Sequence, residues 1–593
     1  MADLHIGPDT ASPEEADIVD AFVAAHGGPA VRRVHPRMIL GGTRAARDRR
    51  HLLLPLLVEL QKQVGWISPG ATNRIAESLE IPPAEVFGVA SFYHLLDTTD
   101  PGGRAPVVHV CDDIVCGSRG GTELAGALSA TGIETRTGPC LGRCESPAAA
   151  LVRRPGVGDV SVGGATVEKV TELLSGSGGE GGRPQVVGRP GVLLRRVGVV
   201  DPTSLEDYRA HGGYRGLARA LEIGPDRVVA AVTGSGLAGR GGAAFPTGRK
   251  WASVASAPPG PREVVANADE SEPGTFKDRV LLESDPFALI EGLTIAGFAT
   301  GAARGWIYLR GEYPEAAATL DRALGAARAA GLLGSDVAGS GFAFDIELRS
   351  GAGAYICGEE TALFNSIEGF RGEPRNKPPY PTVAGLFGRP TAVNNVETLA
   401  NIAPLLTGEA AADTKLFPVS GAVARPGLYE LPLGATLGEV LAAAGGPAGD
   451  AEPAAILIGG AAGTFVGPDD MDLVLTPEAT RAAGVGLGSG AIVVFDSGAD
   501  MGPILERITR FFREESCGQC VPCRVGTVRQ HEQVEALVAG GSSPPHRLAL
   551  LADLAGVMSD ASICGLGHTA AGALRSALAL GLLPGGSGEG DRL

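Results

Sequence analysis

Cysteine spacing constrains this chain more than any other feature of its sequence. Eight of the nine cysteines fall into two groups of four, and only Cys357 stands apart. The first group consists of two separated pairs, and the second of a tight C-x2-C-x2-C run with a distant fourth member. Such grouping predicts two metal or cluster sites. The first group contains Cys111, Cys116, Cys140 and Cys144, and the second Cys517, Cys520, Cys523 and Cys564.

The second group predicts a [4Fe–4S] cluster. Cysteines separated by two residues let one short loop ligate three irons of a cubic cluster. A distant cysteine then supplies the fourth ligand, as in bacterial-type ferredoxins. A tetrahedral zinc site usually takes two C-x2-C knuckles, one from each side, and is the alternative. The apolar stripe of Ile504, Leu505, Ile508, Phe511 and Phe512 predicts a helix directly before this run.

The first group does not have the C-x4-C-x2-C spacing of plant-type ferredoxins. Two separated pairs suit a [2Fe–2S] cluster in which each pair holds one iron, but spacing alone leaves structural zinc as a serious alternative. Glycines at 117, 138 and 142 would let backbone N–H groups approach the sulfurs. Cys357 lies alone in an apolar stretch and is expected to be a buried core residue.

Length, charge and hydropathy exclude several classes of protein. A chain of 593 residues predicts three to five domains, and the net charge of -17 argues against non-specific nucleic-acid binding. We find no apolar run of 18 residues, so no membrane span is expected. The start lacks the basic and apolar segments of a signal peptide. We therefore expect a cytoplasmic protein, with cysteines kept reduced.

The residue pattern predicts a multidomain α/β chain. Helices are expected over 52–64, from Ser68-Pro69 onward, and from Pro82-Pro83 to near Tyr93. Further along, strands are expected at 107–110 and 148–152, and helices at 122–128 and 167–174. The predicted segments, in order, are a mobile tail (1–30), a helical bundle (31–100), a small α/β domain (101–174), a Gly-rich linker (175–188), a second α/β domain (189–410), a β-grasp-like domain with a helix near 437–444 (411–500), and a helical C-terminal domain (501–593).

A long glycine loop is the strongest nucleotide-binding signal. It follows a β-branched segment at 226–233, which predicts a strand, and begins with the G-x-G-x-x-G pattern at 234–239. That pattern alone is weak in a chain with 89 glycines. Arg240, more glycines and Lys250 follow, and glycines let backbone N–H groups reach phosphate oxygens. The loop is too long and too basic for a simple dinucleotide turn, and could hold more than one phosphate group.

Two acidic patches follow, at 267–274 and 357–360. Carboxylates near a flavin and a nicotinamide can accept hydrogen bonds from ribose hydroxyls and from the carboxamide. A solvated loop is the equally weighted alternative.

Seven motifs, in order, resemble a known family. The segment 236–251, NADESEPGTFKDR at 267–279, GAGAYICGEETAL at 351–363, KPPYP at 377–381 and PTAVNNVETLAN at 390–401 resemble the flavoprotein subunit of respiratory complex I. The same pattern occurs in NAD-dependent formate dehydrogenases and NAD-reducing hydrogenases. SCGQCVPCR at 516–524 with ICGLG at 563–567 resembles the family's [4Fe–4S] motif, and residues 65–96 with the first four cysteines resemble its small [2Fe–2S] subunit.

This resemblance implies a fusion of two subunits: a helical bundle with a thioredoxin-like [2Fe–2S] domain, then a Rossmann-like FMN domain, a β-grasp-like domain and a C-terminal helical bundle with [4Fe–4S]. One departure is Ser253, where the family usually has a phenylalanine near the adenine. The implied FMN residues are Gly239, Arg240, Gly241, Lys250, Asn267, Asp269, Glu270, Tyr355, Gly358, Glu359, Glu360, Val393, Asn394, Asn395 and Thr398; the implied NADH residues are Phe245, Glu272, Glu360, Lys377 and Tyr380.

The resemblance also implies a function. NADH would pass a hydride to FMN without a covalent catalytic residue, Glu359 and Glu360 would position the cofactors, the [4Fe–4S] cluster would be the exit, and the [2Fe–2S] cluster a side branch. The chain would be the β subunit of an NAD-dependent formate dehydrogenase. Alternatives are the diaphorase subunit of an NAD-reducing hydrogenase, the complex I input subunit, and a non-catalytic electron-transfer module. The implied partner is a large subunit with molybdenum or tungsten, or with nickel–iron, in a hetero-oligomer such as a dimer of heterodimers.

Overall fold

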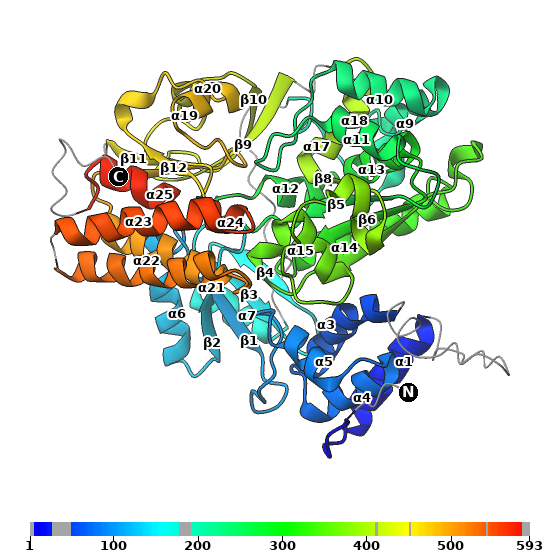
Figure 1. Cartoon of the computed structure of the whole chain (residues 1–593), viewed down its shortest axis with the longest axis horizontal. Coiled ribbons are helices and arrows are strands. Elements are labelled where there is room, and N and C mark those ends of the chain that lie inside the picture. Colours follow the sequence, from blue (N-terminus) through cyan, green and yellow to red (C-terminus); the bar gives the residue numbers. More distant parts are fainter. Residues whose placement is uncertain are drawn as a thin grey trace.

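The computed structural model describes residues 5–26, 49–176, 191–409, 413–449, 452–540 and 544–583. Nearly all of the predicted linker lies outside these ranges. Figure 1 shows N-terminal helices in blue, a green α/β domain, a yellow β-domain and red-orange C-terminal helices. A cyan sheet lies between the blue and the orange helices. One apolar core runs through the first helices, the green domain and the last helices, since Leu57, Val264 and Leu505 belong to the same buried cluster.

The N-terminal region contains α1 (Pro13–Ala25), α3 (Leu53–Val64), α4 (Pro69–Leu79) and α5 (Pro83–Ala90). Helix α4 begins as predicted: Ser68 Oγ accepts the Ala71 N–H at 2.9 Å, and Pro69 occupies the first turn. Helix α5 ends at Ala90, earlier than predicted, and the chain continues without a helix through Tyr93.

Helix α1 corrects the prediction of a mobile tail over 1–30. Ser12 and Glu15 form a capping box: Glu15 N donates to Ser12 Oγ at 3.3 Å, and Ser12 N donates to Glu15 Oε2 at 2.8 Å. Val19 is fully buried, and α1 packs against α3 and α4. The polar composition of the segment concealed a Ser-x-x-Glu cap and an apolar helical stripe.

The small α/β domain contains a four-stranded sheet in the order β2-β1-β3-β4. Strand β1 runs parallel to β2, whereas β3 is antiparallel to β1 and β4. Val108, Val110 and Ala150 form part of its own buried core. The predicted strands and helices are confirmed as Val107–Cys111 (β1), Ala149–Arg153 (β3), Gly121–Ala130 (α6) and Val167–Leu174 (α7). Two further strands were not predicted: Thr135–Gly138 (β2) and Val160–Gly163 (β4).

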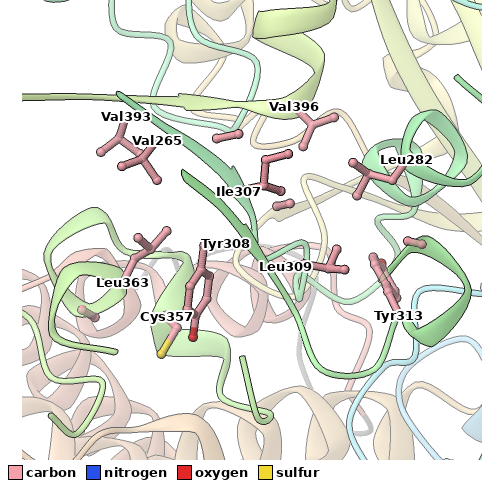
Figure 2. Packing of buried hydrophobic residues seen from close by; sticks show 14 of the residues in the cluster. Val265, Leu282, Ile307, Tyr308, Leu309, Tyr313, Cys357, Leu363, Val393 and Val396 are labelled. Atoms are coloured by element: carbon pink, nitrogen blue, oxygen red, sulfur yellow. The ribbon is translucent and has the colours of Figure 1, made fainter. Parts of the chain in front are cut away.

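The second α/β domain is built on a parallel sheet in the order β7-β6-β5-β8. Figure 2 shows side chains of β5, β6 and β8 packed in its core, among them Val265, Ile307 and Val393. The strands are Glu263–Ala268 (β5), Arg304–Leu309 (β6), Asp345–Ser350 (β7) and Thr391–Asn395 (β8). The helices before β7 are Leu205–Ala210 (α8), Arg215–Ile223 (α9), Pro225–Gly234 (α10), Thr247–Ala255 (α11), Lys277–Ser284 (α12), Pro286–Thr300 (α13) and Pro314–Ala329 (α14). The helices after β7 are Glu360–Ile367 (α15), Pro381–Ala384 (α16), Val396–Ala400 (α17) and Ile402–Leu406 (α18).

The prediction of a strand at 226–233 is wrong, because these residues form α10. Pro225 occupies the first turn after Gly224, which favours a helix start, and Val228 and Val232 are both fully buried at a spacing of four residues. The apolar period is therefore helical, although the residues are β-branched. The glycine loop consequently joins two helices, α10 and α11, instead of following a strand.

The β-grasp-like domain has a five-stranded sheet in the order β10-β9-β13-β11-β12 and its own buried core. The predicted helix is present as α19 (Leu437–Ala443). The other elements are Thr414–Gly421 (β9), Gly427–Pro432 (β10), Pro453–Ile458 (β11), Thr464–Val466 (β12), Ile492–Asp496 (β13) and Pro477–Ala482 (α20).

The C-terminal region is helical, as predicted, and the apolar stripe before the cysteine run is buried on the first of its helices. Nowhere in the described ranges is a helix both long and apolar enough to cross a bilayer. The helices are α21 (Met501–Glu515), α22 (Val521–Gly540), α23 (Pro545–Ala561), α24 (Gly565–Thr569) and α25 (Gly572–Ala579).

Candidate functional site

A cavity of about 510 Å³, here called the main cavity, lies beyond the carboxyl ends of β5 and β8. In parallel α/β sheets this edge is the usual ligand-binding position. Loops of the β-grasp-like domain and helix α24 complete its walls. The predicted residues that line it are Gly241, Asn267, Asp269, Glu270, Glu272, Tyr355, Gly358, Glu359 and Asn395.

Glycines form one wall of the main cavity. Gly241 lies against Asn395: a Cβ added at Gly241 would lie 3.2 Å from the Asn395 Cβ. Gly242 has φ +120°, a conformation that a side chain would strain. The loop backbone can therefore approach a bound ligand as closely as the sequence suggested.

The side chain of Arg240 points away from the main cavity. Its backbone N–H donates to Thr398 Oγ1 at 2.9 Å, and its guanidinium donates to the Thr414 carbonyl at 2.9 Å. Arg240 lines a separate pocket of about 200 Å³ together with Lys415 and Arg481. Burial lowers the pKa of Lys415 to about 8, despite the opposing effect of Glu397.

Three carboxyl groups, of which Glu270 is buried and Asp269 and Glu272 are partly buried, form another part of the lining. Glu270 accepts the N–H groups of Asp278 and Arg279 at 2.8 and 2.9 Å, at the start of α12. Glu272 accepts the Tyr355 hydroxyl at 2.6 Å. Burial raises the pKa of Asp269 and of Glu270 to about 8, and that of Glu272 to about 7. These carboxyl groups can therefore hold a proton near neutral pH and offer a ligand both hydrogen-bond donors and acceptors.

A lysine holds the second acidic patch. Lys377 Nζ donates to Glu359 Oε1 at 2.9 Å and to Glu360 Oε1 at 2.8 Å. The other oxygen of Glu359 accepts the N–H groups of Thr361 and Ala362 and caps α15. The Glu359 carboxylate is therefore held from two sides, by Lys377 and by the start of α15. The patch is thus a structured cap and not a solvated loop.

Other predicted residues lie outside the lining of the main cavity. Lys250 Nζ donates to the Val393 carbonyl at 2.5 Å, and burial lowers its pKa. Asn394 accepts the Trp251 indole N–H at 3.3 Å. Gly239 pairs with the backbone of Phe245. The aromatic rings of Phe245 and Tyr380 are exposed, as is Ser253.

Several lining residues were missed by the sequence reading. Lys277 is 1% exposed and donates to Asp278 at 2.6 Å and to Asn395 at 3.2 Å; its place in the TFKDR motif was the available signal. Other lining residues missed by the sequence reading also lie inside quoted motifs: Gly242, Ala243, Ser271, Thr275, Asp278, Ile356, Gly565 and Leu566. Ala462, Gly486, Gly488, Ser489 and Thr569 had no such signal, because loops of other domains bring them to the cavity.

The first cysteine group converges in the small α/β domain. Cys111 ends β1, Cys116 follows in the next loop, and Cys140 and Cys144 lie between β2 and β3. All four are at most 2% exposed, and the sulfurs of Cys140 and Cys144 are 3.3 Å apart. Gly142 N donates to Cys140 Sγ at 3.4 Å, one of the predicted glycine contacts. Four adjacent thiols fit the ligand set of a [2Fe–2S] cluster.

The second group converges on a small cluster cavity between α21, α22 and α24. Cys517 and Cys520 lie in the α21–α22 loop, Cys523 is in the first turn of α22, and Cys564 precedes α24. Four thiols around one cavity fit the ligand set of a [4Fe–4S] cluster. Ile356 and Leu566 line both this cavity and the main cavity, so one layer of side chains separates the two sites.

Buried arginines join the first cysteine group to the segment that contains Glu270. Arg310 donates to the Cys140 carbonyl at 2.7 Å and to the Glu270 carbonyl at 2.6 Å. Arg279 donates to the Gly142 carbonyl at 2.7 Å. The ninth cysteine, Cys357, is 1% exposed, which confirms the prediction of a core residue.

The fold and these sites define a multidomain flavin and iron–sulfur electron-transfer protein. Four family models match in chain order: a thioredoxin-like [2Fe–2S] ferredoxin over 42–176, a Nuo51 FMN-binding domain over 232–404, an SLBB domain over 416–461, and a NADH-ubiquinone oxidoreductase-F iron–sulfur binding region over 503–580. The matches establish FMN, [2Fe–2S] and [4Fe–4S] as its cofactors.

Curated relatives identify the family. An F-type subunit of NADH-quinone oxidoreductase from Rhizobium meliloti is 44% identical over 402 residues, covering 65% of this chain and 94% of that protein. The HndC subunit of the NADP-reducing hydrogenase from Solidesulfovibrio fructosivorans is 42% identical over 389 residues, covering 64% and 79%. The chain belongs to the family of F-type NADH-quinone oxidoreductase subunits, and it is an NAD(H) oxidoreductase subunit.

A solved structure matches both halves of the chain. It is a chain of the NAD⁺-reducing [NiFe]-hydrogenase in the H2-reduced state, 31% identical, with a TM-score of 0.74 and coverage of 91% of each chain. The air-oxidized state of that enzyme matches with a TM-score of 0.75. The likeness therefore extends over both halves of this chain.

Proposed function

We propose that FMN occupies the main cavity, with NADH binding beside it at Lys377 and Glu360. When bound, the flavin supplies the conversion between the two-electron chemistry of NADH and the one-electron chemistry of the clusters. The glycine wall with Asn395 would hold the phosphate side, and the Glu270 side would receive donors of the flavin. The observation that carries this assignment is that Ile356 and Leu566 line both the main cavity and the cluster cavity.

We propose that electrons leave through the second cysteine group. Cys517 and Cys520 are partly exposed, whereas the four cysteines of the first group are at most 2% exposed. Because electron tunnelling to a partner needs a short path, the partly exposed cluster is the better exit, and the buried one serves as a side branch.

We also propose a cytoplasmic location, since the eight ligand thiols need reducing conditions.

Glu360→Gln tests the NADH site. The substitution removes one of the two carboxylates that Lys377 holds, so we expect the KM for NADH to rise about tenfold, or about 1.4 kcal/mol. The measurement is NADH-dependent ferricyanide reduction by the FMN-loaded chain. Glu347→Gln, an exposed carboxylate, is the matched control. Unchanged kinetics in Glu360→Gln would remove that residue from the NADH site, and no dye reduction by the parent protein would favour the non-catalytic alternative.

We propose that the complete enzyme is a formate dehydrogenase whose partner subunit carries molybdenum or tungsten. Within this chain every cysteine except Cys357 belongs to one of the two groups, so the second substrate must react on another subunit. Hydrogen oxidation at nickel–iron is the second candidate, and the match to the NAD⁺-reducing [NiFe]-hydrogenase over 91% of both chains supports it.

Affinity purification of the tagged chain with its partners distinguishes the two candidates. Metal analysis and NAD⁺ reduction assays with formate or hydrogen are made on the same complex. Molybdenum or tungsten with formate-dependent reduction would support the first candidate. Nickel with hydrogen-dependent reduction would overturn it in favour of the second, and neither activity would point to a complex I role.

A further inference from the structure

Residues 351–358, here called the flavin loop, connect β7 to α15. Tyr355, Ile356 and Gly358 of this loop line the main cavity, and Ile356 also lines the cluster cavity. The position of the loop therefore sets both the shape of the proposed flavin site and the barrier between flavin and cluster. What fixes the loop is consequently part of the function.

The first half of the chain supplies backbone contacts to the flavin loop. His94 N donates to the Gly353 carbonyl at 3.1 Å, and Leu95 N donates to the Ala352 carbonyl at 2.9 Å. Gly353 has φ +83°, and a Cβ there would lie 2.5 Å from His94 Cε1. The flavin loop thus has a glycine where the two segments approach too closely for any other residue.

Tyr93 supplies the side-chain contact, from within the core. It is 1% exposed, and its hydroxyl donates to Ser366 Oγ at 2.8 Å. Tyr308 OH is also 2.8 Å from Ser366 Oγ. A Cβ placed on Gly372 would lie 2.5 Å from Cys357 Sγ and 3.6 Å from the Tyr93 hydroxyl, so the thiol and the hydroxyl lie near the same point. Figure 2 shows Cys357 of the flavin loop beside the Tyr308 ring. Tyr93 therefore links the first half to Cys357, directly before the cavity-lining Gly358.

The C-terminal region contacts the loop from another side: Glu515 accepts the Tyr355 N–H at 2.8 Å. His94 is itself paired with the second α/β domain, since its Nε2 lies 3.3 Å from Glu312 Oε1. The flavin loop is thus in contact with both the C-terminal region and the [2Fe–2S] half, which contributes residues 93–95.

We infer that Tyr93, with the backbone of His94 and Leu95, is a positioning element of the flavin site. The first half of the chain then does more than carry a cluster: its docking sets the flavin loop and, through it, the affinity and potential of the flavin. This inference rests on the proposed placement of FMN in the main cavity. It makes Tyr93 a positioning residue, because its side chain acts through Cys357 and Ser366.

Tyr93→Phe tests the inference, since it removes one hydroxyl and little volume. In the full-length chain loaded with FMN and both clusters, we expect the dissociation constant of FMN to rise about tenfold and the flavin midpoint potential to shift. The EPR signals of both clusters should stay unchanged. Ser366→Ala removes the shared partner of the two tyrosines and should reproduce the effect, which keeps the test valid if one variant folds poorly.

Tyr208→Phe is the matched control. Tyr208 is equally buried and donates to Glu291 Oε2 at 2.7 Å, but it does not contact the flavin loop. FMN affinity and potential equal in the Tyr93, Ser366 and Tyr208 variants would overturn the inference while leaving the flavin site in place. A parent protein that binds no FMN, or an Asn395→Ala variant with unchanged FMN affinity, would instead contradict the proposed placement of FMN itself.

Discussion

Glu270 shows how burial at the main cavity changes the chemistry of a single residue. The carboxyl is 5% exposed, and burial, helped by the neighbouring Asp278 carboxylate, raises its pKa from 4.5 to about 8. Between these two values the folded protein holds a proton that the unfolded chain releases. Below about pH 4.5 the carboxyl is protonated in both states, and its contribution to the free energy of unfolding is at its maximum. That free energy then decreases as the pH rises toward 8.

The predicted result is a pH-dependent stability of the flavin-free protein. Its thermal midpoint should fall between pH 5 and pH 8, and Glu270→Gln, which cannot titrate, should show a smaller fall. Calorimetric scans across this pH range measure the difference. Glu59→Gln, a partly buried carboxyl on α3 remote from the main cavity, is the control, and a fall in Glu270→Gln as large as in the parent would contradict the assignment.

At the scale of elements, short-range signals predicted several helices correctly and misled the interpretation at α1 and α10. Ser68 and Pro69 predicted the start of α4 because a cap and a first-turn proline act within one turn. The valines of α10 favoured a strand by composition, but their spacing of four and Pro225 place them on a helix face. At α1, polar composition outweighed a capping box that was visible in the sequence.

Ser12→Ala tests the importance of that cap. Loss of an N-cap hydroxyl typically costs about 1 kcal/mol, so α1 should open more often while NADH oxidation stays unchanged. Hydrogen exchange of residues 13–25 measures the opening and should be several-fold faster. Ser129→Ala, within α6, should not change exchange in α1; equal protection of α1 in the parent and Ser12→Ala would show that packing of Val19 alone maintains the helix.

At the scale of the whole molecule, arginines of the flavin half hold the [2Fe–2S] domain. Arg279 is fully buried, pairs with Glu145 of that domain and with Glu283 of its own helix, and donates to the Gly142 carbonyl. From α21, Arg507 and Arg510 pair with Asp112, next to Cys111. These contacts fix the two halves relative to each other at the cysteine loops.

Arg279→Leu should therefore destabilise the molecule strongly. Removing Arg279 leaves the buried Glu145 without its cation, while Glu283 keeps its pair with Arg143. Loss of one partner of a buried ion pair typically costs about 3–5 kcal/mol. Denaturant unfolding monitored by the [2Fe–2S] visible absorbance measures the loss. Arg328→Leu breaks an exposed pair with Asp345 and should cost at most about 1 kcal/mol. Similar losses in both variants would show that the buried pair does not hold the domain.

The sequence by itself determined the two cysteine groups, the order of the motif-bearing domains and the starts of several helices, because these are properties of residue identity and order along the chain. The sequence also placed Asn267, Glu272 and Glu359, through the motifs that carry them. Only the tertiary structure decided that the Arg240 side chain turns toward Thr414, and that Ser489 and Leu566 help to enclose the main cavity. These positions depend on the packing of segments more than a hundred residues apart, which no local pattern encodes.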